Sequence, residues 1–123
     1  IWRRLVEQEG RRDLANELAM EIMNKAIVLQ NMGNLTGAVE LFDEGILLLQ
    51  RLVEQEGRRD LLGNLFWVIL CRTYALKDMG LSEVDLRHAR EAYRTLKIEA
   101  QRTGREDLKR TIEWAQGALG EWL

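Results

Sequence analysis

The eleven residues RLVEQEGRRDL occur twice in this chain, at positions 4–14 and again at positions 51–61. The spacing of 47 residues (51 minus 4) also pairs Leu18 with Leu65. A shorter third copy, GREDL, begins at position 104, which lies 47 residues after Gly57 of the second copy. Self-similarity at a fixed spacing is typical of repeat proteins, in which each repeat is one small unit of secondary structure.

The composition indicates that these units are helical. Ala, Glu, Lys, Leu and Arg supply 63 of the 123 residues, a share typical of long helices. The β-branched residues that favour strands number only 18, and there is no proline to interrupt a helix. Since 46% of the residues are hydrophobic, the chain can bury a core. An all-α fold is therefore predicted.

Glycines set the expected ends of the helices. Gly10, Gly57 and Gly104 fall at the same point of each copy, and each is expected to end a helix in equivalent surroundings, because glycine tolerates the left-handed backbone. Gly33 and Gly80 are expected to break the helices that follow. The first helix of each repeat is then expected at 12–32, 59–79 and 106–122, and the second helices at 35–56 and from 82 onward.

Apolar spacing and capping signals support these helices. Leucine or another apolar residue recurs at helical intervals in the first of them, which predicts a buried stripe formed by Leu14, Leu18, Ile22, Ala26 and Leu29. Ser82 to Asp85 resembles a capping box. The two second helices align only at an offset of 51 (93 minus 42), so a longer connection is expected between residues 80 and 86.

The repeats define a single domain. Residues 1–10 are expected to be the tail of a truncated repeat, as if this chain were part of a longer array. The remaining parts are repeat 1 at 11–57, repeat 2 at 58–104, and a half repeat or capping helix at 105–123.

The turn in the first repeat resembles the tetratricopeptide repeat family. Gly33 matches the turn glycine of that family, Ala38, Phe42 and Gly45 match its small–aromatic–small signature, and Ala26 matches the small residue of its first helix. The resemblance implies a right-handed α-solenoid of stacked antiparallel hairpins, with about five helices in this chain. The repeat is longer than the usual ~34 residues and lacks the closing proline, so a long-helix variant is implied. HEAT-like repeats share the longer period, but their proline is missing as well.

Residues that could support catalysis are few. His88 is the only histidine and Cys71 the only cysteine, so neither a zinc cluster nor a nucleophile with a nearby base is predicted. The carboxylates alternate with arginines, which is typical of a solvated helix surface. No catalytic, metal or cofactor site is expected.

One stripe of the first helices is a candidate binding surface. The resemblance implies that it lines the concave groove of the superhelix, where aromatic and amide side chains suit peptide capture. Packing between neighbouring helices is the competing interpretation for Trp67 and Trp114. The predicted groove consists of Met20, Asn24, Ile27, Asn31, Trp67, Cys71, Tyr74, Lys77, Asp78 and Trp114.

The function expected from these features is a non-catalytic scaffold that binds a peptide or protein in the groove, either alone or fused to a domain elsewhere. The alternative is a self-assembling segment, in which apolar residues at the start of the chain (Ile1, Trp2, Leu5, Val6) pair with another copy. With a net charge of −2 and mixed signs, neither nucleic acid nor membrane is an expected partner. A cytoplasmic location is expected because a lone cysteine suggests no disulfide framework.

Overall fold

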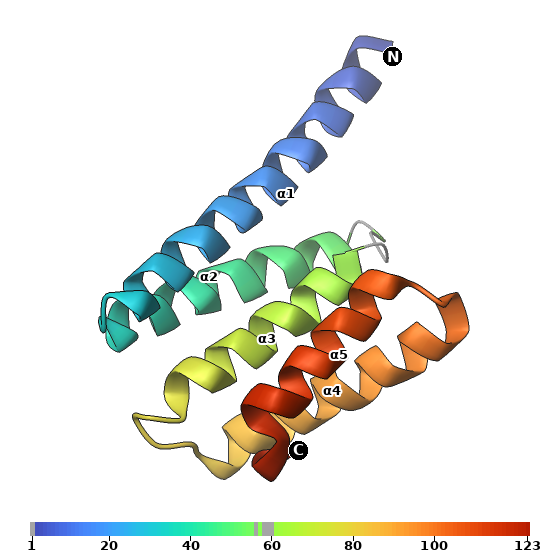
Figure 1. Cartoon of the computed structure of the whole chain (residues 1–123). Coiled ribbons are helices and arrows are strands. Elements are labelled where there is room, and N and C mark those ends of the chain that lie inside the picture. The colour runs from blue at the N-terminus through green and yellow to red at the C-terminus, as the bar shows by residue number, and fades with distance from the viewer. Residues whose placement is uncertain (1, 56, 58–60) are drawn as a thin grey trace. The chain divides into compact units, whose positions relative to one another are not determined.

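Every regular element described in the structure, a computed structural model, is helical, as predicted (Figure 1). The structure describes the backbone of residues 2–55, 57 and 61–123. Within these ranges, it describes the side chains of residue 14 and of all residues from 16 onward. The chain divides into two compact units, residues 1–62 and 63–123. The elements are α1 (Trp2–Asn31), α2 (Leu35–Glu54), α3 (Leu62–Leu76), α4 (Glu83–Thr103), α5 (Glu106–Leu119) and the short 3₁₀ helix η2 (Gly120–Trp122).

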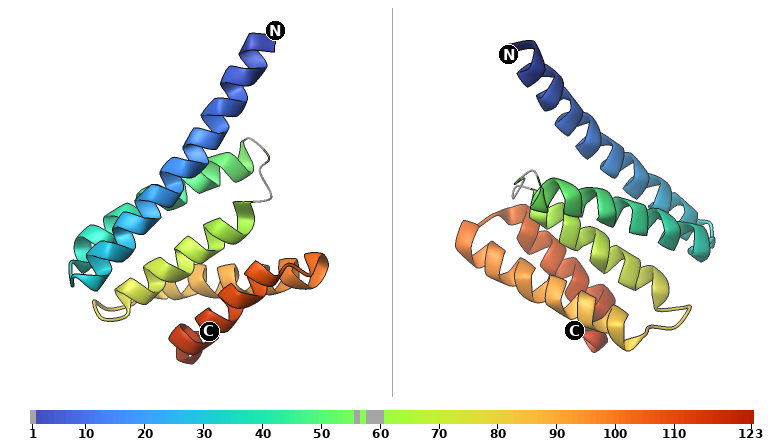
Figure 2. Two further views of the ribbon diagram at one scale, coloured as in Figure 1. Left: turned by 45° about the horizontal axis from the view of Figure 1, so that its top comes forward. Right: turned by 180° about the vertical axis from the view of Figure 1, so that it is seen from behind.

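The first unit is an antiparallel hairpin formed by α1 and α2 (Figures 1 and 2). Gly33 has a φ of 85°, a left-handed conformation, and it ends α1 at the predicted place. Asn34 then caps α2, because its side-chain oxygen accepts a hydrogen bond of 3.0 Å from the backbone N–H of Gly37. A β-carbon at Gly37 would approach the Asn34 side chain to 2.9 Å, so glycine keeps this cap in place.

The buried side of α1 differs from the predicted stripe. Leu14 and Leu18 are 64% and 50% exposed, so the prediction that they are core residues is wrong. Ala26, which belongs to the predicted stripe, is fully buried as expected, but the other fully buried positions, Ala19 and Met23, lie farther round α1 on the side next to that stripe. The physical reason is that α1 carries two apolar stripes, and α2 packs its bulky Phe42 and Leu49 on the side where alanines allow the helices to approach closely.

The prediction that Gly10 ends a helix is also wrong. α1 continues through this residue as one helix of 30 residues, whereas Gly57 and Gly104 have φ values of 67° and 68° and lie just beyond helix ends, as expected. The equivalence predicted for the three glycines therefore holds at two of them. Identical residues are helical at positions 4–14, yet at 51–61 the helix ends at Glu54. At about 1.5 Å per residue, α1 is roughly half as long again as α2, and its first turns extend past the end of that helix (Figure 1).

The second unit contains α3, α4 and α5, which share one core. α4 and α5 run antiparallel and pack against each other (Figure 2). α3 contributes Leu70 to the core, and a β-carbon on Gly63 of α3 would lie 2.5 Å from the Leu108 side chain on α5, so these two helices approach closely. The buried cluster consists of Leu70, Ala89, Ala92, Leu96, Ala100, Leu108, Ala115 and Leu119.

The capping box predicted at the start of α4 is confirmed. Ser82 and Asp85 form a reciprocal capping box, in which the Ser82 hydroxyl accepts from the Asp85 N–H and the Asp85 carboxylate accepts from the Ser82 N–H. The connection before α4 covers residues 77–82 and is longer than the first one, at 32–34. Most of its extra length precedes Gly80, because α3 ends at Leu76, whereas the sequence predicted the extra residues between 80 and 86. Antiparallel hairpins are therefore present in both units, while their stacking into a right-handed solenoid stays a prediction.

Candidate functional site

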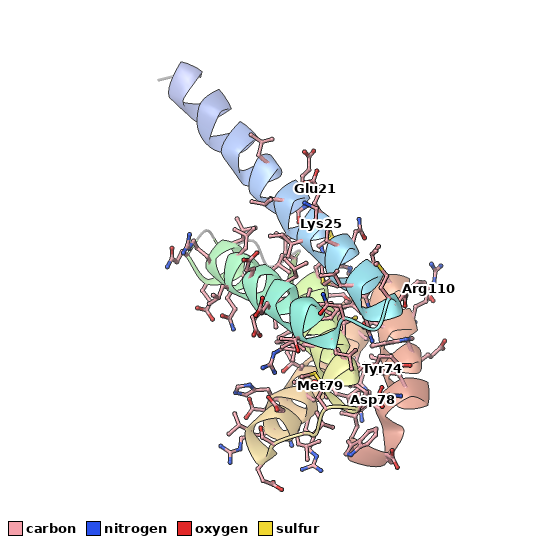
Figure 3. All side chains as sticks on the ribbon, turned by 90° about the vertical axis from the view of Figure 1, so that its left-hand side faces the viewer. Glu21, Lys25, Tyr74, Asp78, Met79 and Arg110 are labelled. Atoms are coloured by element: carbon pink, nitrogen blue, oxygen red, sulfur yellow. The ribbon has the colours of Figure 1, made fainter. Side chains whose placement is uncertain are left out.

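The residues of the predicted groove are divided between the two units. Four of them lie on α1 in the first unit, where Met20 and Ile27 are half-buried and Asn24 and Asn31 are exposed. The other six belong to the second unit. Figure 3 labels two further exposed side chains of α1, Glu21 and Lys25, one helical turn apart. In the first unit, the predicted stripe therefore combines two exposed amides with two half-buried apolar side chains.

The second unit brings together two of its predicted groove residues from different helices. The ring centroids of Tyr74 on α3 and Trp114 on α5 are 6.0 Å apart, and the ring planes are tilted by 57°. Such a tilted pair contributes about 1 kcal/mol beyond the area it buries. Trp114 remains 38% exposed and Tyr74 is half-buried, so the pair offers part of its aromatic area to solvent.

A cation completes this arrangement. The Nζ atom of Lys77 lies 4.1 Å from the centroid of the Tyr74 ring, within the range of a cation–π interaction. Lys77 follows Tyr74 by three residues at the end of α3, so both side chains leave the same side of the chain. We call Tyr74, Lys77 and Trp114 the Tyr74–Trp114 surface.

Charged side chains border the Tyr74–Trp114 surface. Asp78 is exposed just beyond the end of α3, and Arg110 is exposed one turn before Trp114 on α5, as Figure 3 shows for the labelled residues. Tyr74 also packs against the buried cluster of the second unit, which fixes the position of its ring. The result is a small aromatic area held by the core and bordered by charges of both signs.

The remaining predicted groove residues of the second unit, Trp67 and Cys71, lie two turns and one turn before Tyr74 on α3, respectively. Trp67 is half-buried. Cys71 is only 6% exposed, and burial raises the pKa of its thiol to about 12. The thiol therefore stays protonated at neutral pH and packs as a small apolar group, offering little surface to a ligand. His88 on α4 is exposed.

Sequence reasoning placed Tyr74 and Trp114 on one predicted face but missed that their rings meet. It also missed the ion pair between Arg72 on α3 and Asp85 on α4, whose Nη1 and Oδ1 atoms are 2.9 Å apart. Nothing in the spacing of these residues signals a contact between helices. The alternation of arginine with carboxylates indicated only a solvated surface.

The described residues contain no group of three or more His, Cys, Asp or Glu side chains placed to hold a metal ion. Within the same part of the chain, no helix combines the length and the apolar content needed to cross a membrane. No protein-family model, no curated protein and no solved structure matches this sequence. The likeness to tetratricopeptide repeats thus depends on the residues quoted above.

Proposed function

We propose that this chain is a non-catalytic interaction module of the cytoplasm, similar to tetratricopeptide repeats, that binds a peptide segment of a partner protein. The observation that carries the proposal is the Tyr74–Trp114 surface of the second unit. Trp and Tyr dominate the binding energy of protein interfaces because they bury a large area with little loss of conformational freedom. Recognition of this kind requires no catalytic group.

The geometry supports a peptide with an apolar anchor residue. An apolar side chain of the ligand would cover the exposed part of Trp114, which is 38% of this residue, and the edge of the Tyr74 ring. Asp78 and Arg110 stand at the border, where they can pair with backbone or charged groups of the same peptide.

The test uses peptides selected from a random library against the whole chain. Replacing Trp114 by alanine is expected to weaken a selected peptide by about tenfold or more, as at an interface hot spot. Ile98→Ala is the matched control, because Ile98 is 57% exposed on α4, away from the Tyr74–Trp114 surface. Circular dichroism should give nearly the same helix content for both variants, with a melting temperature only a few degrees lower for Trp114→Ala, which loses the ring pair.

Two results would reject this assignment. If Trp114→Ala or Tyr74→Ala unfolds the chain, the aromatic pair is part of the core and not a binding surface. If Ile98→Ala weakens the selected peptides as much as Trp114→Ala does, the peptides bind elsewhere.

A further inference from the structure

One side of α1 carries a row of exposed side chains that is apolar at both ends. Leu14 and Leu18 are 64% and 50% exposed at one end of the row, and Val28 and Met32 are 55% and 75% exposed at the other. Single exposed apolar side chains are ordinary on a protein surface, whereas a continuous row of them marks a contact surface. The spacing of the row and the charges within it indicate what this contact is.

The row has the spacing of a coiled-coil seam. Its positions are separated alternately by four and three residues, which keeps them on one side of the helix. The molecule itself sets both ends of the row. Met32 closes the last turn of α1, because its backbone N–H donates a hydrogen bond of 3.0 Å to the carbonyl of Val28, and the next two positions in the other direction are the charged Arg11 and Glu7. We call this row of exposed residues the α1 seam, which consists of Leu14, Leu18, Glu21, Lys25, Val28 and Met32.

We propose that the α1 seam pairs with the α1 seam of a second copy of this chain, antiparallel about a twofold axis that passes between Glu21 and Lys25. In a twofold contact, residue i of one copy meets residue j of the other, and j meets i. The register then places position 14 opposite position 32 and position 18 opposite position 28, so every apolar side chain of the seam meets an apolar one. Helices that pair through a seam of this spacing cross at about 20°.

The charges within the α1 seam favour this arrangement over a parallel one. Glu21 and Lys25 are exposed on α1, where Figure 3 labels both. The antiparallel register places Glu21 of each copy opposite Lys25 of the other, which gives two pairs of opposite charge. A parallel pairing in register would place Glu21 against Glu21 and Lys25 against Lys25, and like charges at such positions disfavour association.

The residues that flank the α1 seam are compatible with the same register. On one side, Glu17 comes near Asn31 of the second copy and Asn24 comes near its own equivalent, so the described charges on this side do not repel one another. On the other side, the half-buried Ile22 and Leu29 extend the apolar contact. The antiparallel contact is therefore apolar along its length and bordered by polar groups on one side, as is usual at an interface.

Sedimentation velocity across a wide concentration series tests this proposal. One helix from each copy buries roughly 1,200 Å² or less, the low end for a specific interface, so the unmodified chain is expected to form a weak, reversible dimer as its concentration rises. Leu18→Asp is expected to weaken association by about tenfold or more, because it places a charge in the interface. Leu47→Asp is the matched control, since Leu47 is 65% exposed on α2 and does not belong to the seam.

Charge reversal tests the antiparallel register itself. Glu21→Lys and Lys25→Glu each convert both ion pairs of the dimer into pairs of like charge, so each variant alone is expected to dimerise about fivefold more weakly or worse. An equimolar mixture of the two variants is expected to restore association, because the two glutamates of one copy then face the two lysines of the other. Glu40→Lys, which makes the same change at an exposed position of α2, is the control and should dimerise like the unmodified chain.

Three results would overturn the proposal. The first is a chain that stays monomeric throughout the series, and the second is an equal effect of Leu18→Asp and Leu47→Asp. The third is a pair of charge-reversed variants that dimerise as strongly alone as the unmodified chain, or no more strongly when mixed. The dimer does not depend on the proposed function, since the Tyr74–Trp114 surface belongs to the second unit, so Leu18→Asp should leave peptide binding unchanged.

Discussion

The carboxylate of Asp85 connects two helices of the second unit, which makes its removal an informative perturbation. It accepts hydrogen bonds of 3.2 Å and 2.8 Å from the backbone N–H and hydroxyl of Ser82, which complete the cap of α4. It also pairs with Arg72 of α3, and only 24% and 17% of the Arg72 and Asp85 side chains are exposed. Replacing Asp85 by alanine therefore removes the carboxylate half of the capping box, while the Ser82 hydroxyl can still accept from the backbone N–H of residue 85. It also leaves a partly buried guanidinium without this carboxylate.

The expected loss follows from these two contributions. Loss of the hydrogen bonds from Ser82 to the carboxylate costs about 1 kcal/mol, and loss of a hydrogen bond to a charged, partly buried partner costs roughly another 1.5 kcal/mol. Because Arg72 can turn toward water and recover part of this loss, Asp85→Ala should lower the free energy of unfolding by about 2 kcal/mol, somewhat less than the sum of the two contributions. Asp107→Ala is the control, because Asp107 also lies in a first helical turn and pairs with an arginine, but its side chain is 58% exposed. Its loss should remain below about 1 kcal/mol.

Urea unfolding followed by circular dichroism and tryptophan fluorescence measures both losses. The pH dependence gives a second measure. Burial by itself would raise the pKa of Asp85, but hydrogen bonds from Arg72 and Ser82, together with the charge of Arg72, outweigh it and hold this pKa below its usual value. The stabilising contribution is therefore present above the unfolded pKa of about 3.9 and is lost as the pH falls through the lower folded pKa. The difference between the unmodified chain and Asp85→Ala should shrink as the pH falls below about 4. Equal losses for the two alanine variants at neutral pH, or a difference that does not change with pH, would refute the reasoning.

Two further predictions concern Gly10, Gly57 and Cys71. Gly10→Ala should stabilise the chain by up to about 1 kcal/mol because the residue lies inside a helix, whereas Gly57→Ala should cost about 1 kcal/mol because its φ is 67°. Thermal unfolding at low concentration measures both changes. Changes of the same sign would contradict the different backbone conformations of the two glycines. The thiol of Cys71, with its pKa raised to about 12 by burial, should react with Ellman's reagent far more slowly in the folded chain than in urea, and rapid reaction of the folded chain would place it on an accessible surface.

Local signals in the sequence determined where most helices begin and end. The capping box at Ser82 and the left-handed glycines at positions 33, 57, 80 and 104 are where the pattern predicted them. Each of these signals acts within about one helical turn, through a hydrogen bond or a backbone angle that neighbouring residues decide. For this reason, the all-α class and the antiparallel hairpins could be read without any knowledge of tertiary contacts.

Only the tertiary structure decided which face of α1 is buried, and in which of the two identical eleven-residue segments the helix ends. Two apolar stripes run along α1, and packing with α2 buries the one through Ala19 and Met23, leaving Leu14 exposed. Gly10 and Gly57 lie in the same eleven residues, yet one is inside a helix and the other is beyond a helix end. The local preference of glycine is worth only about 1 kcal/mol, so the surroundings of each copy can outweigh it. The pairing of Tyr74 with Trp114 likewise joins residues forty positions apart, and no signal confined to a few neighbouring residues can specify such a contact.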